Sequence, residues 1–559
     1  MKTIKNILYT ATAFVLLGCS DFLEQNPQGI LDEEQVKNAE QVEGLVTAAY
    51  ASLGNDHYDI PFSLWPYGNV RSDDSYKGGG DENDIVNFHF YEISENIKTD
   101  FGEADGMWFN CFQAISRANS ALSVLKSIDV SQYPNRDVRM GEMYFLRGHF
   151  YFILKEIFGH IPYVDEDTPL DDYVKVPNNL PNDELWALIC GDFQKAYELL
   201  PASQPQIGRA NKIAAAAYLS KAYLFKAFRQ NEMNGFTGVD ATDLNNVITY
   251  ADVVLGSSYG LETDFAHNFL PGIYQNGRES IFAVQYSVSD GTMFGRLNFG
   301  DVLSLPMGLG CCDFHKPSQN LVNAFKTTNG LPQFDTYNNA NYDSNTDSSD
   351  PRLFHTVAMP DFPWKYNQDL IYRGNWNRTP NVYGYYASLK ENVDPSCDCF
   401  VNLSPFYGNS KNRIILRYAD ILLAKAEALV ELGRESEALP LVNQLRERAA
   451  ASTAMVSYAP NLSVANYVDG ANCNWTQDFA RQAVRWERRL EFAMEGQRFF
   501  DLVRWGVAEE VLNEYFASET PRRYYYAAAR FNKNKDEYIP IPQQQISFTN
   551  GIYTQNPGW

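Results

Sequence analysis

Apolar residues recur at alternating three- and four-residue spacings through the first half of the chain. This is the spacing of one helix face, and it predicts a series of amphipathic α-helices. In residues 139–159 the apolar face is almost entirely aromatic, and Gly159 and Pro162 are expected to end the helix. The predicted helices span residues 39–53, 108–125, 139–159, 182–200, 211–229 and 241–256.

The same spacing returns in residues 413–450, which predict a hairpin of two helices. Gly433 is expected to end the first helix, and Ala438 lies five residues later, inside the second. Together with Ala426 and Val442, these residues fit the small-residue pattern of a tetratricopeptide repeat. One such hairpin cannot bury its apolar face alone, so the earlier helix pairs are expected to stack beside it.

Residues 257–412 lack a sustained period and are rich in Gly, Pro, Asn and Asp. Only ESIFAVQYS, residues 279–287, resembles a strand. A long irregular stretch inside a compact domain normally carries functional loops. The chain is therefore predicted to form one helical scaffold with an irregular lobe. The scaffold is assigned to residues 39–256 and 413–516, the lobe to 257–412, and an extended C-terminal segment to 517–559.

Charge narrows the possible partners. The net charge is -23 and the pI is about 4.8, so the protein repels nucleic acid and anionic membrane surfaces. We therefore expect no nucleic-acid partner.

The N-terminus predicts export and lipidation. Lys2 and Lys5 precede an apolar run, residues 7–17, that is too short to span a bilayer. The following Leu-Leu-Gly-Cys matches a bacterial lipobox. Residues 1–18 are therefore expected to be a lipoprotein signal peptide, Cys19 the acylated residue, and residues 19–38 the anchor and tether.

The segment ERRLEFAMEGQRFFDLVRW contains three glutamates, and two of them together would supply the pair of carboxylates that a glycoside hydrolase uses. Glu487, Glu491 and Glu495 are four residues apart and would lie on one helix face. A hydrolase needs its two carboxylates on opposite sides of the sugar, about 5–9.5 Å apart, and one helix face does not provide that cleft. The segment also contains its own arginines, so ion pairs along and between helices are the preferred interpretation. Those arginines are Arg485, Arg488, Arg489, Arg498 and Arg504.

Two further motifs suggest chemistry but lack its context. GSSYG around Ser258 matches a nucleophile elbow, which requires a preceding strand, whereas the pattern before it predicts a helix that Gly256 caps. DSNTD at 343–347 has the alternating oxygens of a calcium loop but not its glycine or its final glutamate. No Cys/His spacing resembles a zinc site. We expect no catalytic residue, metal or cofactor.

Several segments together resemble the SusD/RagB family of outer-membrane nutrient-binding lipoproteins of Gram-negative bacteria. The motifs occur in the family's order, from the lipobox to the C-terminus. They are CSDFLEQNPQG, AISRANSAL, GEMYFLRGHFYFILKEIFGHIPYV, RYADILLAKAEALVELG, ERRLEFAMEGQRFFDLVRW, YIPIP and TQNPGW. The resemblance implies an all-α fold with about four tetratricopeptide-like helix pairs and an irregular lobe. It also implies glycan binding without catalysis at the cell surface, and delivery to a SusC-like TonB-dependent transporter in the outer membrane.

A noncatalytic sugar site needs exposed rings for the flat sugar faces and polar side chains for the hydroxyl edges. Residues 63–93, between the first two long helices, offer both around a helix-breaking Gly-Gly-Gly. The family's contacts vary between members, so none is carried over residue by residue. The candidates here are Trp65, Tyr67, Asn69, Asp73, Asp74 and Tyr91.

A second candidate region lies in the lobe, in residues 305–317 and 362–386. Adjacent Cys311 and Cys312 would form either a vicinal disulfide, giving a rigid apolar plate, or two free thiols. The accompanying candidates are Trp364, Trp376, Arg378 and Tyr383. A peptide-binding, RagB-like member of the same family and an exported hydrolase are the alternative functions. Cys111 and Cys190, within helical patterns, are expected to be inert core thiols.

Overall fold

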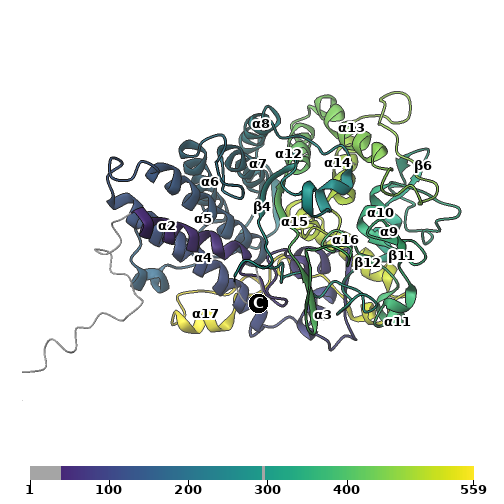
Figure 1. The fold of residues 1–559 in the computed structure, drawn as a ribbon, viewed down its shortest axis with the longest axis horizontal. Helices are drawn as coiled ribbons and strands as arrows, with labels where there is room; N and C mark the ends of the chain where they lie inside the picture. Colours follow the sequence, from purple (N-terminus) through teal and green to yellow (C-terminus); the bar gives the residue numbers. More distant parts are fainter. Residues whose placement is uncertain (1–38, 292–295) are drawn as a thin grey trace, which may run out of the picture.

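The computed structural model describes residues 39–291 and 296–559 (Figure 1). The signal peptide, Cys19 and the tether lie outside the described residues, so lipidation at Cys19 stays a prediction. The described chain is mainly helical, and its core runs continuously from the N-terminal helices into the C-terminal segment. Among its helices, none has both the length and the apolar character needed to cross a bilayer.

The helical scaffold forms because the predicted apolar faces pack against one another. Each helix from α4 to α8 packs on the next, and α12 packs on α8, α13 and α14. In α7, residues 214–217 are all alanine and fully buried. These small side chains allow α6 and α8 each to pack closely against α7. The scaffold helices are α2 (Ala39–Ala51), α4 (Gly102–Ser127), α5 (Arg136–Phe158), α6 (Asn182–Leu199), α7 (Lys212–Ala227), α8 (Ala241–Leu255), α12 (Tyr418–Glu431), α13 (Glu435–Ala451) and α14 (Gln477–Phe492).

Glycine ends the helices where the sequence predicts it. Gly159 and Gly433 both have positive φ, +70° and +72°, a conformation that costs glycine little. Gly433 N donates to Val430 O at 3.0 Å, which closes the last turn of α12. The hairpin starts later than predicted, however, because residues 413–417 form a strand.

The prediction of an all-α fold is too narrow, because short strands run through the lobe and its borders. Strand β4 (Ser280–Val284), the predicted one, pairs antiparallel with β15 (Arg413–Arg417) and joins the two ends of the lobe. The other strands near or in the lobe are β1 (Ser75–Gly78), β5 (Phe314–Pro317), β6 (Lys326–Thr328), β7 (Leu331–Pro332), β8 (Ser348–Ser349), β9 (Val357–Ala358), β10 (Pro363–Trp364), β11 (Asn367–Ile371), β12 (Ala387–Ser388), β13 (Phe400–Leu403) and β14 (Phe406–Asn409). Strands β2 (Phe228–Gln230) and β3 (Phe236–Val239) form a hairpin between α7 and α8.

Short helices complete the lobe and the C-terminal region. The segment after residue 517, predicted as extended, contains a helix, α17. It lies at the same end of the molecule as α4 (Figure 1), and Gln545 donates to the Asp105 carboxylate at 2.8 Å. The remaining helices are α3 (Val86–Ile93), α9 (Gln319–Ala324), α10 (Arg352–Thr356), α11 (Pro380–Tyr383), α15 (Arg498–Arg504), α16 (Ala508–Glu519) and α17 (Gln543–Phe548).

The glutamates of residues 487–505 form buried ion pairs between elements. Helix α14 ends at Phe492, so Glu495 lies in the turn before α15 and not on the predicted single helix face. Glu491 accepts hydrogen bonds from Arg352 at 3.0 Å and Arg417 at 2.8 Å. Glu495 accepts from Lys390 at 2.7 Å. The interpretation as ion pairs is confirmed, but the partner cations come from other segments of the chain.

Candidate functional site

Eight of the predicted ligand residues are at most 2 % exposed, because their loops fold into the core. Residues 65–70 form a single π-helical turn, and all six are buried. Trp65 donates its indole N–H to Gly300 O at 3.2 Å, and Tyr67 packs 5.5 Å from the Tyr91 ring. The prediction that these side chains are exposed is wrong, and we leave them out of the proposed ligand site. They are Trp65, Tyr67, Asn69, Asp73, Asp74, Tyr91, Trp364 and Tyr383, each at most 2 % exposed.

The carboxylates in this loop are structural. Arg489 of α14 donates to Asp74 at 2.8 Å, and Arg498 of α15 donates to Asp73 at 2.8 Å. Burial alone would raise the pKa of Asp73, but the two guanidinium groups lower it to about 2. The acids therefore bind the loop to α14 and α15 and are not available to a sugar.

The remaining lobe candidates lie near one another on the surface. Trp376 is half-buried, Arg378 is exposed, and Cys311 is half-buried. Sequence reasoning missed two exposed rings, Tyr385 and Tyr524, which are 49 % and 67 % exposed. The Tyr385 ring lies beside Gly374, and Tyr524 donates to Glu82, two residues from the Asp84 partner of Arg378. We call this surface the lobe face and define it as Cys311, Trp376, Arg378, Tyr385 and Tyr524.

The Trp376 ring is positioned by the loop that contains the adjacent cysteines. Tyr372 meets it edge-on, with ring centroids 5.7 Å apart. Met307 N donates to Trp376 O at 2.9 Å, and the ring lies so close over Gly308 that a Cβ there would collide with it. Cys311 and Cys312 form the vicinal disulfide. Cys312 is buried, so only Cys311 contributes to the surface.

A second disulfide joins Cys397 and Cys399 in the same lobe, and no sequence pattern predicts it. Cys111 and Cys190 are free and buried, as predicted for core thiols, and burial raises the pKa of both. Cys473 is also free.

Arg378 supplies the polar side of the lobe face. Its guanidinium donates to the Asp84 carboxylate at 2.7 Å, and its backbone N–H donates to Asp313 at 2.7 Å. The Arg378 and Asp84 side chains are 40 % and 30 % exposed, so their remaining hydrogen-bonding positions face solvent. Thr379 beside it donates to Gly79 O at 2.8 Å, which joins the two loops. An exposed Arg–Asp pair beside partly exposed rings has the donors, acceptors and stacking surfaces that a sugar requires.

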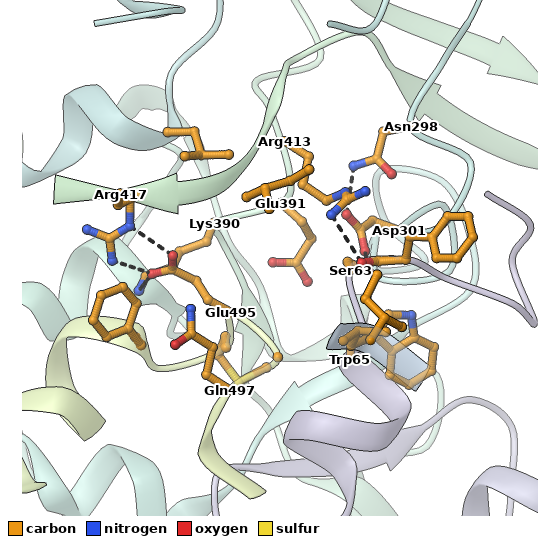
Figure 2. A pocket seen from close by; sticks show the side chains of 18 of the residues that line it. Ser63, Trp65, Asn298, Asp301, Lys390, Glu391, Arg413, Arg417, Glu495 and Gln497 are labelled. Carbon is orange, nitrogen blue, oxygen red and sulfur yellow. Dashed lines mark hydrogen bonds and ion pairs between the residues drawn. The ribbon is translucent and has the colours of Figure 1, made fainter. Parts of the chain in front are cut away.

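A cavity of about 150 Å³, lined by charged, polar and apolar side chains, lies where the scaffold, the lobe and the 492–500 segment meet. Figure 2 shows Arg417 bonded to Glu495 at the left, and Asn298, Asp301 and Trp65 at the right. Arg413 lies between Arg417 and Asn298 in this view. We call it the central cavity. It also contains His149 and Glu156 of α5 and Lys411 before β15.

Glu156 makes the stability of the protein depend on pH. Burial raises the pKa of its carboxyl to about 8, although Lys221 opposes the shift. The unfolded chain releases this proton near pH 4.5, the folded chain only near pH 8, so stability falls as pH rises between these values. We predict that Glu156→Gln gains stability relative to the wild type across this range, by up to about 1.4 kcal/mol per pH unit.

Urea denaturation at the two ends of this pH range measures the difference. Glu514→Gln, at an exposed position of α16, is the control. A difference between Glu156→Gln and wild type that does not change with pH would contradict the assignment.

The alternative catalytic motifs have no supporting geometry. Helix α8 ends directly before Gly256, whose N–H donates to Asp252 O at 2.9 Å, so Ser258 follows a helix and not a strand. Within residues 39–291 and 296–559, no group of three or more His, Cys, Asp or Glu side chains is placed to hold a metal.

Two family models match the chain. The model described as "SusD family" matches residues 278–559, and the model described as "Starch-binding associating with outer membrane" matches residues 21–224. The chain is 25% identical to SusD-like protein P2 of Formosa agariphila, over 100% of both chains. It is 24% identical to a SusD-like protein of Bacteroides ovatus, covering 90% of this chain and 82% of the relative.

Solved structures share the fold. A SusD-like protein from Bacteroides fragilis superposes with a TM-score of 0.72 at 22% identity, covering 94% of this chain and 98% of that one. A structure titled "Laminarin binding SusD-like protein" has a TM-score of 0.66 at 21% identity, covering 94% and 100%. Surface glycan-binding protein A from Bacteroides fluxus has a TM-score of 0.63 at 21% identity, covering 93% and 100%.

Proposed function

The chain belongs to the SusD family, and on that premise we propose that it is a noncatalytic, cell-surface glycan-binding lipoprotein. The family match confirms the resemblance seen in the motifs. The observation that carries the proposal is the lobe face, where the Trp376, Tyr385 and Tyr524 rings lie near the exposed Arg378–Asp84 pair. The titles of two structural neighbours, one laminarin-binding and one surface glycan-binding, support the same ligand class.

We propose that a sugar ring stacks on the lobe face and that its hydroxyls bind Arg378 and Asp84. Aromatic rings bind the apolar C–H face of a sugar, and a charged pair that is open to solvent accepts and donates hydrogen bonds at the edge. Cys311 would extend the apolar surface beside Trp376. Tyr385 and Tyr524 are exposed and Arg378 pairs at the surface, so changes to these three side chains are expected to leave the fold in place.

Removal of the rings is expected to weaken sugar binding. Trp376→Ala and Tyr385→Ala should each raise the Kd for the bound oligosaccharide by about tenfold or more, because buried aromatic contacts dominate binding energy. Isothermal titration of the purified protein against a panel of oligosaccharides first identifies the ligand and then measures the variants.

The control is Phe109→Ala, at a ring of α4 that is 57 % exposed. Helices α4 and α11 lie at opposite ends of the molecule (Figure 1), so this change should leave the Kd unaltered. Equal affinity in wild type, Trp376→Ala and Tyr385→Ala would disprove the site. Binding of oligopeptides but no sugar would favour the RagB-like alternative, and release of sugar products would favour a hydrolase.

The expected context follows from the family. We propose acylation at Cys19, attachment to the outer membrane facing the exterior, and delivery of the glycan to a SusC-like TonB-dependent transporter. We also propose that the stacked helix pairs, including α12 with α13, are tetratricopeptide-like. Labelled palmitate in a Cys19→Ser variant tests the anchor, and copurification of a barrel protein with the tagged lipoprotein tests the partner.

A further inference from the structure

We propose that the central cavity binds a small organic carboxylate, independently of the glycan. The cavity is about 150 Å³, and an apolar cavity of that volume holds a benzene-sized molecule. A ligand of about six non-hydrogen atoms therefore fits. Since the walls carry several charged side chains beside the apolar ones, we expect the occupant to supply hydrogen bonds and charge.

Three of the four acids that line the cavity have protein partners, and the fourth, Glu156, is uncharged at neutral pH because burial raises its pKa to about 8. Asp301 accepts from Ser63 at 2.5 Å and from Asn298 at 2.6 Å. Glu391 is bonded to His315 at 2.8 Å. Glu495 accepts from Lys390 and Arg417. These carboxylates leave little attraction for a ligand cation.

The unpaired charge in the cavity is positive. Lys411 is 6 % exposed, and among the described residues its ammonium group has no bonded carboxylate, although Asp301, Glu391 and Glu495 attract it from beyond ion-pair distance. Among the described residues, Arg413 donates to two neutral oxygens, Phe62 O at 3.0 Å and the Tyr286 hydroxyl at 3.5 Å, and the Asp56 and Asp301 carboxylates attract it from beyond ion-pair distance. A buried ammonium without a partner is costly, so the site is complete only with an anion.

The rest of the lining favours a hydroxyl on the same ligand. Asn298 is 3 % exposed, and its Oδ1 has no hydrogen-bond donor among the described residues. Burial, with Arg413 and Lys221 nearby, lowers the pKa of His149 to about 3, so its imidazole is neutral. A hydroxy acid would place its carboxylate at Lys411 and Arg413 and could donate its hydroxyl proton to Asn298 Oδ1.

The experiment compares two probes of equal size, sodium L-lactate and glycerol. By isothermal titration we expect lactate to bind once per chain, and glycerol at least about tenfold more weakly, because it lacks the negative charge. Lys411→Met keeps the chain length and removes the charge. It should weaken lactate binding by at least about tenfold, while Lys98→Met, at an exposed position, should not change it.

Thermal denaturation separates binding from a structural role. Without lactate, Lys411→Met should melt at or above the wild-type temperature, since it removes an unpaired buried charge. With lactate, only the wild type and Lys98→Met should gain in melting temperature. The proposal is overturned if lactate binds no better than glycerol, if Lys411→Met binds lactate as the wild type does, or if crystals grown with lactate hold water alone in the cavity.

Discussion

Gly68→Ala will destabilise the protein by about 3 kcal/mol or more, at the upper end of overpacking effects. Gly68 lies in the buried turn of residues 65–70, against the backbone of Gly496. An alanine Cβ at position 68 would stand 2.9 Å from Gly496 Cα, and closer still to its carbonyl carbon and oxygen. Because these are backbone atoms, no side-chain rotation relieves the clash. Gly496 itself has φ +76° and lies against Ser63 O, so it cannot easily move away.

The matched control is Gly44→Ala, in the interior of helix α2. Among the residues that the structure describes, no atom lies within 4 Å of a Cβ at that position, and alanine is a better helix former than glycine. Gly44→Ala should therefore stabilise the protein by about 0.5–1 kcal/mol. Urea denaturation midpoints of the two variants measure the contrast. If Gly68→Ala were as stable as the wild type, the turn of residues 65–70 would not be packed tightly against the backbone of residue 496.

Glu491→Gln should cost about 3–5 kcal/mol, the usual penalty for breaking a buried ion pair on one side. Glu491 is fully buried and bonded to Arg352, Arg417 and Arg448. Burial alone would raise its pKa, but the three guanidinium groups hold it well below its ordinary value of 4.5. Removal of the charge leaves those arginines buried beside a neutral amide.

The pH dependence of this variant has a defined sign. Because the folded pKa is lowered, the carboxylate contributes its full stability above pH 4.5 and loses it as the pH falls towards the folded value. The difference between wild type and Glu491→Gln should therefore shrink in acid. Glu514→Gln, at an exposed position of α16, should stay within about 0.5 kcal/mol of wild type at neutral pH. A small effect of Glu491→Gln would contradict the ion-pair assignment.

The helices could be predicted because each carries its own signal. The apolar spacing that predicts α5 and α7 lies within each helix itself, and so do the glycines that end helices at residues 159 and 433. These patterns do not depend on which other part of the chain covers the apolar face. The lobe strands span only two to five residues, too short for a period to be visible in the sequence.

The burial of residues 63–93 could not be predicted, because the residues that pair with this loop are distant in sequence. Its Gly-Gly-Gly and its acids are typical of an exposed loop, but Asp73 and Asp74 are paired with Arg489 and Arg498, more than 400 residues away. No local pattern contains that pairing, which helps to hold the loop of Trp65 against the core. The exposure of Tyr385 and Tyr524 could not be predicted either. Each lies among neighbouring tyrosines, and the residue type alone does not say which of them is buried and which is exposed.

A crystal structure of the protein with the oligosaccharide identified by titration tests the central claim most directly. We predict a sugar ring over Trp376, with hydroxyl groups bonded to Arg378 or Asp84 and the glycosidic bonds intact. A sugar bound elsewhere on the protein, with the lobe face empty, would contradict the account, as would a cleaved product.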